Sequence, residues 1–467
     1  MMGRLFGLLV AKLFSPLSSF LLIVLITRIW GTESLGQYST VLVWFAIFQF
    51  ISLFGAGEYL SKEIGRKPSA ASRYLIHGLF FGLVASLICM VCMGGGAMFF
   101  NYSRDIQYSI LAMSISLPFV ASIMICHSVF TTFQKIKYVA IASVLESALI
   151  MLSGIFVIYR HYGLFMLIGC LVIIRIVSAV LNLYIVHTYV VRLEYPVKLD
   201  RSFLKKLVAA IAIFGVTGMA FQLFMRIDIL ILSGMVDMVD VGLYSSASKL
   251  WEMCLMLPLT FYILNLPVIA KAYQSSEGTV QEETESYVRN LFIPVFLIFG
   301  FVFFFAESML QFIYGPSFGS ALWLLRILIL AFLIQSGEMV LGMICQASGH
   351  HKAAMNIAVF RAGANIVLNF VLIPVMGLPG AALATLLSIV FSFIVFHIYV
   401  RGTLHQFRWF SVVSRPAVIC LFTMVVLFPL RDHINTIALY VMFVLGYALL
   451  IFVPTGFRLK TNPSSLK

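Results

Sequence analysis

Two ionisable residues stand only two positions apart in the stretch AFQLFMRIDILILSGMV, which is otherwise almost wholly apolar. They are Arg226 and Asp228. Placing one charge in hydrocarbon costs roughly 2.5–3.5 kcal/mol on insertion scales, so charged residues at membrane depth are rare. A base at this depth could bind a negatively charged passenger, and an acid could exchange a cation. The stretch is therefore the first candidate for a functional site.

Lys249 and Glu252 stand at the matching depth on the next apolar segment. Consecutive spans joined by a short turn lie side by side and antiparallel, so residues equally far from the turn share a depth. At 1.5 Å per residue, the four charges occupy a band roughly 9–16 Å below the outer surface. Arg226 and Asp228 point about 200° apart on one helix, so a single neighbour cannot pair with both. We interpret the four residues as lining a hydrated cavity, with a purely structural network as the alternative.

Three further acid–base combinations satisfy the same depth rule on neighbouring segments. They are Glu146 with Arg175, Glu307 with Arg326, and Glu338 with Arg361. An acid and a base at one level lower each other's cost of burial, so we predict structural ion pairs, with a transport role of their own as the alternative. Arg361 also begins a polar stripe with Asn365 and Asn369 at i, i+4 and i+8, which fits helix packing and a lumen equally well. Arg28 ends the first apolar segment with no acid at its level, so it is a further cavity candidate.

The composition shows what kind of element must position these residues. Of the 467 residues, 62% are hydrophobic and 10% are charged, and the mean hydropathy is +1.05. Soluble proteins hold about 25% charged residues. We therefore predict an all-α polytopic membrane protein with about fourteen transmembrane helices, with twelve as the alternative because two separators are weak. The first apolar run is too long for a signal peptide and lacks a small-residue cleavage site, so it is predicted to be an uncleaved span.

The basic residues predict the orientation of the chain. Most of the 31 Lys and Arg residues fall in connections on one side, and the connections on the other side carry only Arg28, Arg104, Arg160 and Arg431. Basic loops stay in the cytoplasm, so both termini are predicted to be cytoplasmic. The net charge of +13 is then explained by a basic cytoplasmic face that lies against anionic lipid, and it does not indicate a nucleic-acid-binding surface.

An internal repeat predicts the domain organisation. SLGQYSTVLVW (34–44) is similar to DVGLYSSASKLW (240–251), and FQKIKYVAIASVLESALIML (133–152) runs parallel to SGHHKAAMNIAVFRAGANIVL (348–368). Each repeat holds an even number of spans, so the repeats share one orientation, as in transporters that alternate around a central cavity. We predict a six-helix lobe at 1–190, a basic cytoplasmic linker at 191–205, a second six-helix lobe at 206–400, and an appended helix pair with a cytoplasmic tail at 401–467.

Residues for enzyme chemistry are missing from the sequence. The seven cysteines lie in apolar segments, and the pair Cys89 and Cys92 has no second pair and no nearby His, so a metal or redox site is not expected. The sequence has no ATP-binding motif and no Ser-His-Asp set, and the predicted outer connections are too short to house an acceptor site. We predict a transporter and not an enzyme, with no catalytic residue, no metal and no cofactor.

Four stretches carry a resemblance to a known family. They are RIWGTESLGQYSTV (28–41), LFGAGEYLSKEIGR (53–66), RIDILILSGMVDMVDVGLYSSASKLWE (226–252) and NLPVIAKAY (265–273). The sequence resembles polysaccharide transporters, and within them O-antigen flippases of the Wzx type, in the multidrug/oligosaccharidyl-lipid/polysaccharide exporter superfamily. The resemblance covers nearly the whole chain. It implies two six-helix lobes arranged as a V around a central cavity that opens to one side at a time.

The resemblance also implies a function. Such flippases move an undecaprenyl-pyrophosphate-linked oligosaccharide, such as an O-antigen repeat unit, from the cytoplasmic to the periplasmic leaflet of the bacterial inner membrane. The family often has an acidic residue in the seventh span, which Asp228 matches, and cationic lumen residues, which Arg28, Arg226 and Lys249 match loosely. Asp228 and Glu252 are accordingly the candidates for coupling to a cation.

Several alternatives and partners belong to this prediction. A multidrug or small-molecule cation antiporter could use the same fold. Two alternatives from other functional classes are a membrane polysaccharide polymerase and a structural scaffold for a glycan-assembly complex. The expected partners are the lipid-linked oligosaccharide substrate, membrane lipids, and a polymerase or other glycan-assembly proteins. No nucleic-acid partner is expected, and the protein is expected to be a monomer.

Overall fold

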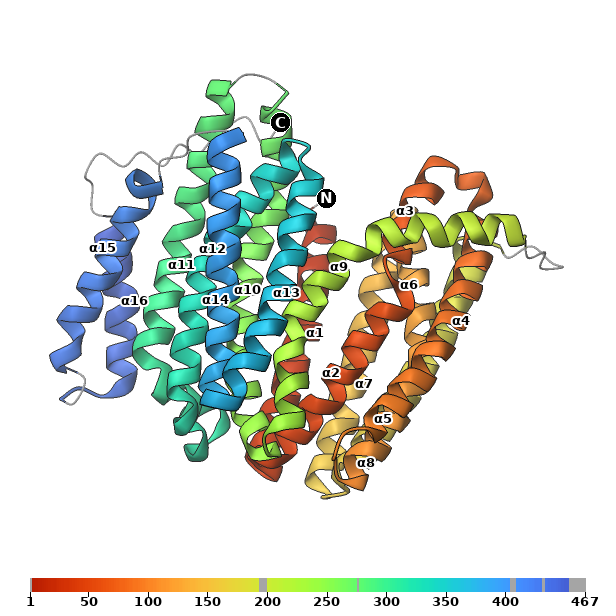
Figure 1. Ribbon diagram of the computed structural model, residues 1–467, viewed down its shortest axis with the longest axis horizontal. Helices are drawn as coiled ribbons and strands as arrows, with labels where there is room; N and C mark the ends of the chain where they lie inside the picture. Colours follow the sequence, from red (N-terminus) through yellow and green to blue (C-terminus); the bar gives the residue numbers. More distant parts are fainter. Residues whose placement is uncertain (1, 193–199, 275–276, 404–408, 431–432, 453–467) are drawn as a thin grey trace. The chain divides into compact units, whose positions relative to one another are not determined.

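The computed structural model describes residues 2–192, 200–274, 277–403, 409–430 and 433–452. Within these ranges the chain forms helices and no strands, which confirms the all-α prediction (Figure 1). The α-helices are α1 (Met2–Trp30), α2 (Thr32–Leu53), α3 (Ala56–Arg66), α4 (Ala71–Met98), α5 (Arg104–Ser114), α6 (Leu117–Thr132), α7 (Ile136–Tyr159), α8 (Gly163–Tyr189), α9 (Arg201–Met235), α10 (Met238–Ala272), α11 (Glu277–Tyr314), α12 (Leu322–Ala347), α13 (His351–Met376), α14 (Leu378–Thr403), α15 (Trp409–Leu427) and α16 (Thr436–Phe452). Short 3-10 helices lie at Pro68–Ala70, Pro316–Ala321 and Phe428–Leu430.

The number of membrane-spanning helices agrees with the prediction. In the described part of the chain, 12 helical segments are long and apolar enough to cross a membrane, and two shorter apolar helices lie at Phe14–Trp30 and Thr436–Ile451. Together they account for about fourteen apolar helices, as predicted from the sequence. Helices are the expected solution because hydrocarbon offers no partners to backbone N–H and C=O groups.

Two of the apolar segments are each built from two helices. Between α2 and α3, Phe54 and Gly55 adopt left-handed backbone conformations with φ of 40° and 85°, which ends α2. Between α5 and α6 the chain breaks before Leu117, and Pro118 follows in the first turn of α6, where its missing N–H costs nothing. The second break leaves Ser116 outside both helices, and its hydroxyl accepts a hydrogen bond from the half-buried Arg175 on α8.

The chain divides into two compact units. The first comprises Met1–Lys249, Leu310–Leu324 and Met355–Ser392, and the second comprises Leu250–Met309, Leu325–Ala354 and Phe393–Lys467. These boundaries differ from the predicted lobes at 1–190 and 206–400, which follow the sequence repeat and stay a prediction. Part of the predicted linker, 193–199, lies outside the described residues, and α9 begins at Arg201.

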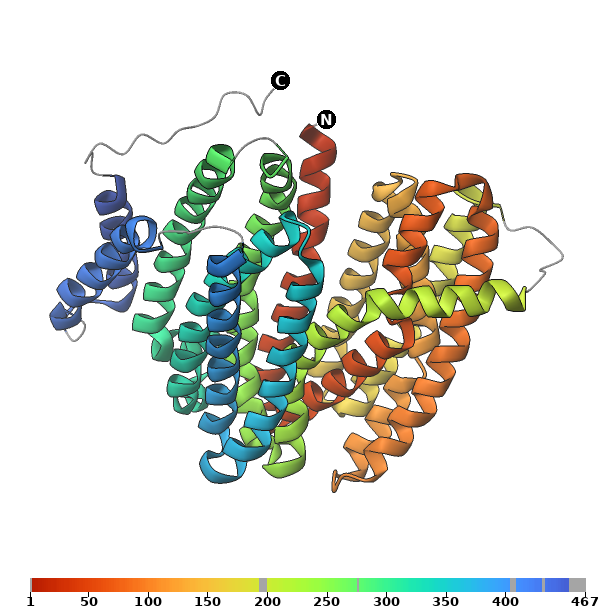
Figure 2. The ribbon, with the colours of Figure 1, turned by 45° about the horizontal axis from the view of Figure 1, so that its top comes forward.

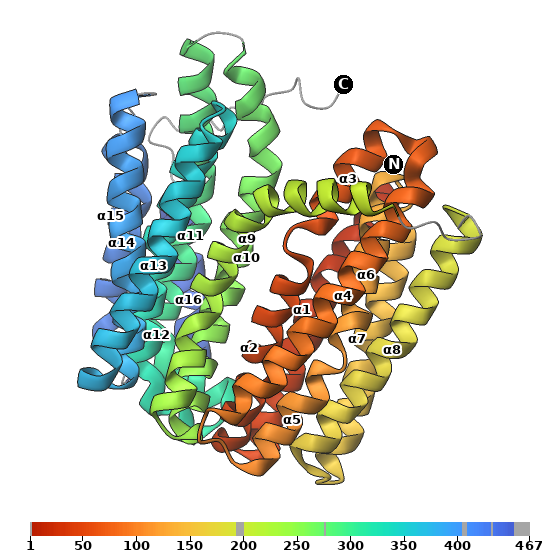
Figure 3. The same cartoon turned by 45° about the vertical axis from the view of Figure 1, so that its right-hand side comes forward.

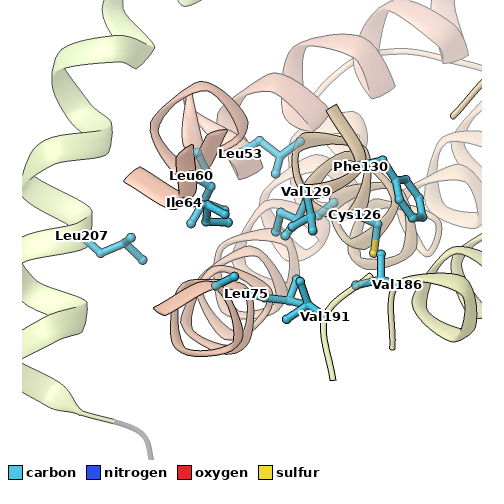
Figure 4. Close-up of a cluster of buried hydrophobic side chains, with 14 of the residues drawn as sticks. Leu53, Leu60, Ile64, Leu75, Cys126, Val129, Phe130, Val186, Val191 and Leu207 are labelled. Carbon is cyan, nitrogen blue, oxygen red and sulfur yellow. The ribbon is translucent and has the colours of Figure 1, made fainter. Parts of the chain in front are cut away.

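The first turns of α9 cover one end of the first unit. Figures 2 and 3 show this part of α9 running crosswise over the ends of α3, α4 and α6. Its underside buries Leu207 and Ile211, each 1% exposed, against a cluster that includes Leu60, Leu75 and Val129 (Figure 4). Burying one Leu or Ile side chain contributes about 1.5–3 kcal/mol, so this contact stabilises the first turns of α9 against the other helices of the first unit.

Two glycines from the sequence repeat meet where α2 and α10 begin. A Cβ atom added to Gly36 would lie 1.9 Å from the Met238 carbonyl oxygen, and one added to Gly242 would lie 2.1 Å from the Thr32 carbonyl oxygen. Gly36 and Gly242 occupy equivalent positions of the repeat, in GQYS and GLYS. The two helices therefore approach each other through reciprocal contacts that no larger residue can make.

In the second unit, α15 and α16 pack against α11. Phe443 lies in a cluster with Phe304 and Phe305, and the Tyr447 hydroxyl donates to the Ile293 carbonyl at 2.9 Å. The Cys420 thiol donates to the Phe296 carbonyl at 3.3 Å. The appended helix pair is thus fixed to α11 by both apolar and polar contacts.

Candidate functional site

A buried carboxylate on α9 is the centre of the candidate site. Asp228 is 6% exposed, and donors from three other helices of the first unit hold it. Tyr244 Oη on α10 and Asn369 Nδ2 on α13 each donate to a carboxylate oxygen at 2.8 Å, and Thr385 Oγ1 on α14 donates at 2.5 Å. Hydrogen bonds to a charged group contribute about 1.5–3 kcal/mol each, so the three donors offset much of the cost of the buried acid.

Two asparagines of α13 add buried polar atoms beside this acid. Asn365 and Asn369 are fully buried, and Asn365 faces the Asp228 carboxyl group. Within the described part of the chain, the Oδ1 atom of Asn369 makes no hydrogen bond. A buried polar group without a partner costs about 1–3 kcal/mol. This amide oxygen adds to the polar surroundings of Asp228.

The register of α9 and α13 explains why these side chains meet. Arg361 stacks on the Phe224 ring with its guanidinium carbon 4.1 Å from the ring centroid, and Asn369 bonds Asp228. Phe224 and Asp228 are one turn apart on α9, and Arg361, Asn365 and Asn369 follow one another turn by turn on α13. The polar stripe predicted on this segment therefore faces α9, and its asparagines reach the acid.

The donor set suits a small hard cation or a proton. Asp228 supplies one negative charge, and neutral oxygens are available from Thr385, Tyr244 and the two asparagine amides. Oxygen ligands are those that hard cations prefer. In the described residues no group of three or more His, Cys, Asp or Glu residues could hold a metal ion.

The other three charged residues of the predicted cavity lie on α9, which carries Asp228, and on the next helix, α10. Arg226, in the C-terminal third of α9, and Lys249, in the first half of α10, are half-buried, and both belong to the first unit. Glu252 is also half-buried and belongs to the second unit. Their roles in substrate binding and in ion coupling stay predictions.

Arg28 contacts carbonyl groups and not an acid. Its Nε donates to the Ile313 carbonyl at 2.9 Å, and its Nη2 donates to the Phe312 carbonyl, at the C-terminal end of α11. A cation is favourable there because the last carbonyls of a helix carry partial negative charge. The side chain is otherwise exposed, so the structure gives Arg28 a structural partner, and its cavity role stays a prediction.

Arg175 is held by a hydroxyl and a ring. Its Nη1 donates to Ser116 Oγ at 3.1 Å, and its guanidinium carbon lies 4.2 Å from the centroid of Phe45. Glu146 is near enough to interact electrostatically with Arg175, but the direct hydrogen bond of the guanidinium goes to Ser116. The predicted pair is thus a longer-range interaction between these two described residues.

The two remaining predicted pairs are Glu307 with Arg326 and Glu338 with Arg361. Arg326 Nε donates to the Phe303 carbonyl at 3.4 Å and its guanidinium lies 5.3 Å from the Phe303 ring centroid, in the same unit as Glu307. Glu338 and Arg361 are both buried but belong to different compact units. Both pairings stay predictions.

Three residues that donate hydrogen bonds to Asp228 were not predicted from the sequence. Tyr244 lies in the repeat motif, but the motif indicates only an internal repeat and gives no role to the tyrosine hydroxyl. Thr385 lies in an apolar run, and Asn369 was assigned only to a polar stripe. A usable signal existed in Tyr244, because a tyrosine stands at the equivalent position, Tyr38, in the other copy of the repeat.

The second unit contains an apolar cavity. It has a volume of about 460 Å³, within the range of about 300–1,000 Å³ typical of ligand pockets. Its walls come from α11, α12, α14 and α15, and they are formed by Phe292, Phe296, Leu333, Ile334, Gly337, Phe393, Val413, Ser414 and Ala417. A cavity with such walls suits a hydrocarbon chain better than a polar ligand.

Comparison with solved structures defines the class of this fold. A lipid II flippase MurJ in an inward closed conformation matches with a TM-score of 0.79 and 14% identity, over 95% of this chain and 97% of that one. An inward-facing multidrug resistance MATE family transporter of the MOP superfamily matches with a TM-score of 0.68 and 14% identity, over 85% and 99%. The chain therefore has the same fold as these two solved structures.

Sequence comparison gives the family. The chain belongs to the family described as polysaccharide biosynthesis protein, whose model matches residues 5–273. It is 27% identical over 165 residues to a probable low-salt glycan biosynthesis flippase, Agl15, of Haloferax volcanii. That match covers 34% of this chain and 34% of the relative, so it spans about a third of the relative's length. These findings confirm the resemblance inferred from the sequence.

Proposed function

We propose that this protein is a flippase that moves a lipid-linked oligosaccharide across the membrane by alternating access. The observation that supports this most is the family match combined with a fold shared with a lipid flippase over nearly the whole chain. The proposed substrate is an undecaprenyl-pyrophosphate-linked oligosaccharide, such as an O-antigen repeat unit. The proposed location is the bacterial inner membrane, with both termini in the cytoplasm.

The chemistry of such a substrate explains why a polar path is needed. Each unpaired sugar hydroxyl costs about 4–8 kcal/mol on transfer from water to hydrocarbon, so a glycan head cannot cross a bilayer alone. Basic side chains are suitable partners for a pyrophosphate, and Arg226 and Lys249 are the proposed ones. An inside-negative potential favours outward movement of negative charge by about 2.3 kcal/mol per charge per 100 mV.

Cation exchange at Asp228 is the proposed source of coupling. The acid is buried, belongs to the helix that carries Arg226, and accepts a hydrogen bond from Asn369, whose amide oxygen has no hydrogen-bond partner among the described residues. An ionisable residue within a membrane marks an ion or proton path by default. Binding of a monovalent cation would neutralise the carboxylate and change which helices it holds together, and Glu252 is the second coupling candidate.

A reconstitution experiment tests the proposal. Purified protein in liposomes should carry a fluorescent polyprenyl-pyrophosphate oligosaccharide to the opposite leaflet, where a membrane-impermeant quencher or glycosidase detects it. Liposomes without protein and a dye that multidrug transporters export serve as controls. Export of the dye without movement of the glycolipid would overturn the proposal in favour of a multidrug antiporter.

The first prediction concerns the two basic residues of the proposed cavity. Arg226→Ala and Lys249→Ala should each lower glycolipid translocation about 10- to 100-fold, because each removes a charged partner of the pyrophosphate worth about 1.5–3 kcal/mol. Protein abundance in the membrane should stay unchanged. The matched control is Arg104→Ala, which removes an exposed arginine at the start of α5. Normal translocation by the double variant would show that the two residues do not line the path.

The second prediction concerns the apolar cavity of the second unit, which we assign to part of the lipid chain. Ala417→Phe should fill the cavity and lower translocation of a long-chain glycolipid about tenfold, since excluding two CH₂ groups costs about 0.8 kcal/mol each. A short-chain analogue should be carried at the normal rate. Val418→Phe is the control, because Val418 is 63% exposed on the same helix. Equal effects of the two variants would contradict the assignment.

A further inference from the structure

A buried histidine holds the start of α9 on α4. His77 is 1% exposed, and its Nε2 accepts a hydrogen bond from the backbone N–H of Asp200 at 2.9 Å. Its Nδ1 lies 2.7 Å from the Arg73 carbonyl oxygen one turn earlier on α4. Asp200 is the residue before α9, and its carboxylate caps the helix by accepting from the N–H groups of Ser202 and Phe203.

These two contacts determine the protonation state of the ring. A backbone N–H can only donate, so Nε2 must carry a lone pair, and a carbonyl oxygen can only accept, so Nδ1 must carry the proton. His77 is therefore neutral, and one tautomer is defined. A second proton would place an N–H at Nε2 against the N–H of Asp200, at a separation of 2.9 Å between the nitrogen atoms. One of the two groups would then have to move away.

Neighbouring side chains add further contacts between the start of α9 and α4, beside the hydrogen bond from Asp200 to His77. Arg73 Nη2 donates to Asp200 Oδ2 at 2.5 Å, and the Arg73 guanidinium lies 4.6 Å from the Phe203 ring centroid. His77 itself meets the Phe203 ring edge-on, with centroids 4.7 Å apart. The start of α9 is thus attached to α4 by a histidine, an ion pair and an aromatic contact.

The charged and titratable groups around the contact come from three elements. They are Tyr59 and Glu63 on α3, Arg73 and Tyr74 on α4, and Asp200 and Arg201 at the start of α9. Hydrogen bonds from the Phe203 and Ser202 N–H groups, together with the Arg73 charge, lower the pKa of Asp200. The ion pair of Asp200 with Arg73 therefore persists on acidification, whereas histidine is the side chain type that changes charge between about pH 5 and 8.

We propose that His77 is a proton-sensitive latch, whose hydrogen bond to the backbone N–H of Asp200 strengthens the attachment of α9 to α4 while its ring is neutral. Protonation releases the backbone of Asp200 and loosens the underside of α9, where Leu207 and Ile211 are buried. Because α9 is one continuous helix from Arg201 to Met235, the latch acts on the element that carries Asp228. Cytoplasmic acidification would in this way change the freedom of that helix, whatever cargo the protein carries.

Hydrogen exchange on the full-length protein in nanodiscs tests the latch. The amides of residues 200–211 should lose protection about tenfold between pH 8.0 and pH 5.0, after correction for the intrinsic effect of pH on exchange, because a hydrogen bond and its aligned neighbours are lost. Amides within α4 serve as the internal reference. His77→Gln keeps an acceptor and a donor in the side chain but does not titrate, so its protection should be independent of pH.

Two further measurements keep the proposal falsifiable. His77→Leu should show low protection at residues 200–211 at both pH values, and if this variant does not fold, the comparison of wild type with His77→Gln decides alone. Nitrogen-15 NMR of labelled histidine should show a His77 ring protonated at Nδ1 and not at Nε2 at pH 8.0. An Nε2-protonated ring at that pH, or an equal loss of protection in His77→Gln and wild type, would overturn the proposal.

Discussion

Asp228→Asn is expected to lower cation-dependent translocation about 10- to 100-fold while the protein stays folded, because an interaction between the charged carboxylate and a bound cation, worth about 1.5–3 kcal/mol, is lost. The substitution keeps the shape of the side chain and one acceptor for the donors on Tyr244, Asn369 and Thr385. It removes the charge that a cation would neutralise. An alanine would be a poorer test, since it would leave three buried donors without a partner and destabilise the fold as well.

The measurement separates loss of coupling from loss of fold. Translocation is followed in liposomes with an imposed sodium or proton gradient, with the membrane potential clamped, and the thermal stability of each variant is recorded beside it. Asp105→Asn is the matched control, because Asp105 is an exposed acid at the start of α5. Thr385→Val should give a smaller loss, since it removes one donor and keeps the charge. Unchanged, gradient-dependent transport by Asp228→Asn would show that the coupling acid lies elsewhere, with Glu252 as the next candidate.

Composition alone was enough to predict the class of fold, and the physical reason is general. A chain that is 62% hydrophobic cannot leave its backbone unpaired in lipid, so apolar runs of sufficient length must be helices. The positions of breaks within spans are harder to predict. Phe54 adopts a left-handed conformation because the Gly55 that follows allows a sharp turn between α2 and α3, and hydropathy carries no signal for that turn.

The site was predictable only in part, because the depth rule pairs neighbours in sequence. It identified Asp228 as a buried charge, but the acid is held by α13 and α14, which are far away along the chain. It considered only acids as partners of bases, whereas Arg28 binds helix-terminal carbonyls and Arg175 binds a serine and a ring. Lateral contacts between helices that are distant in sequence require either a structure or an alignment of homologues.

Gly36→Ala and Gly242→Ala are each expected to destabilise the fold strongly, although each adds only one methyl group. The added Cβ atoms would lie 1.9 Å from the Met238 carbonyl oxygen and 2.1 Å from the Thr32 carbonyl oxygen, which no rotamer change can relieve because both neighbours are backbone. The two helices would have to separate, at a cost of typically about 1–3 kcal/mol for overpacking. The controls are Gly95→Ala and Gly169→Ala, which meet nothing within 4 Å on α4 and α8. These should be neutral or gain up to about 1 kcal/mol, because alanine favours a helix more than glycine does.

The double variant gives the decisive result. Both glycines act at one crossing of α2 and α10, so the separation that accommodates the first Cβ also makes room for the second. The loss of thermal stability in Gly36→Ala/Gly242→Ala should therefore be clearly smaller than the summed losses of the single variants, which is the signature of coupled sites. Additive losses would mean two independent contacts. A sub-additive loss would show that the equivalent glycines of the two copies of the repeat form one shared contact between α2 and α10.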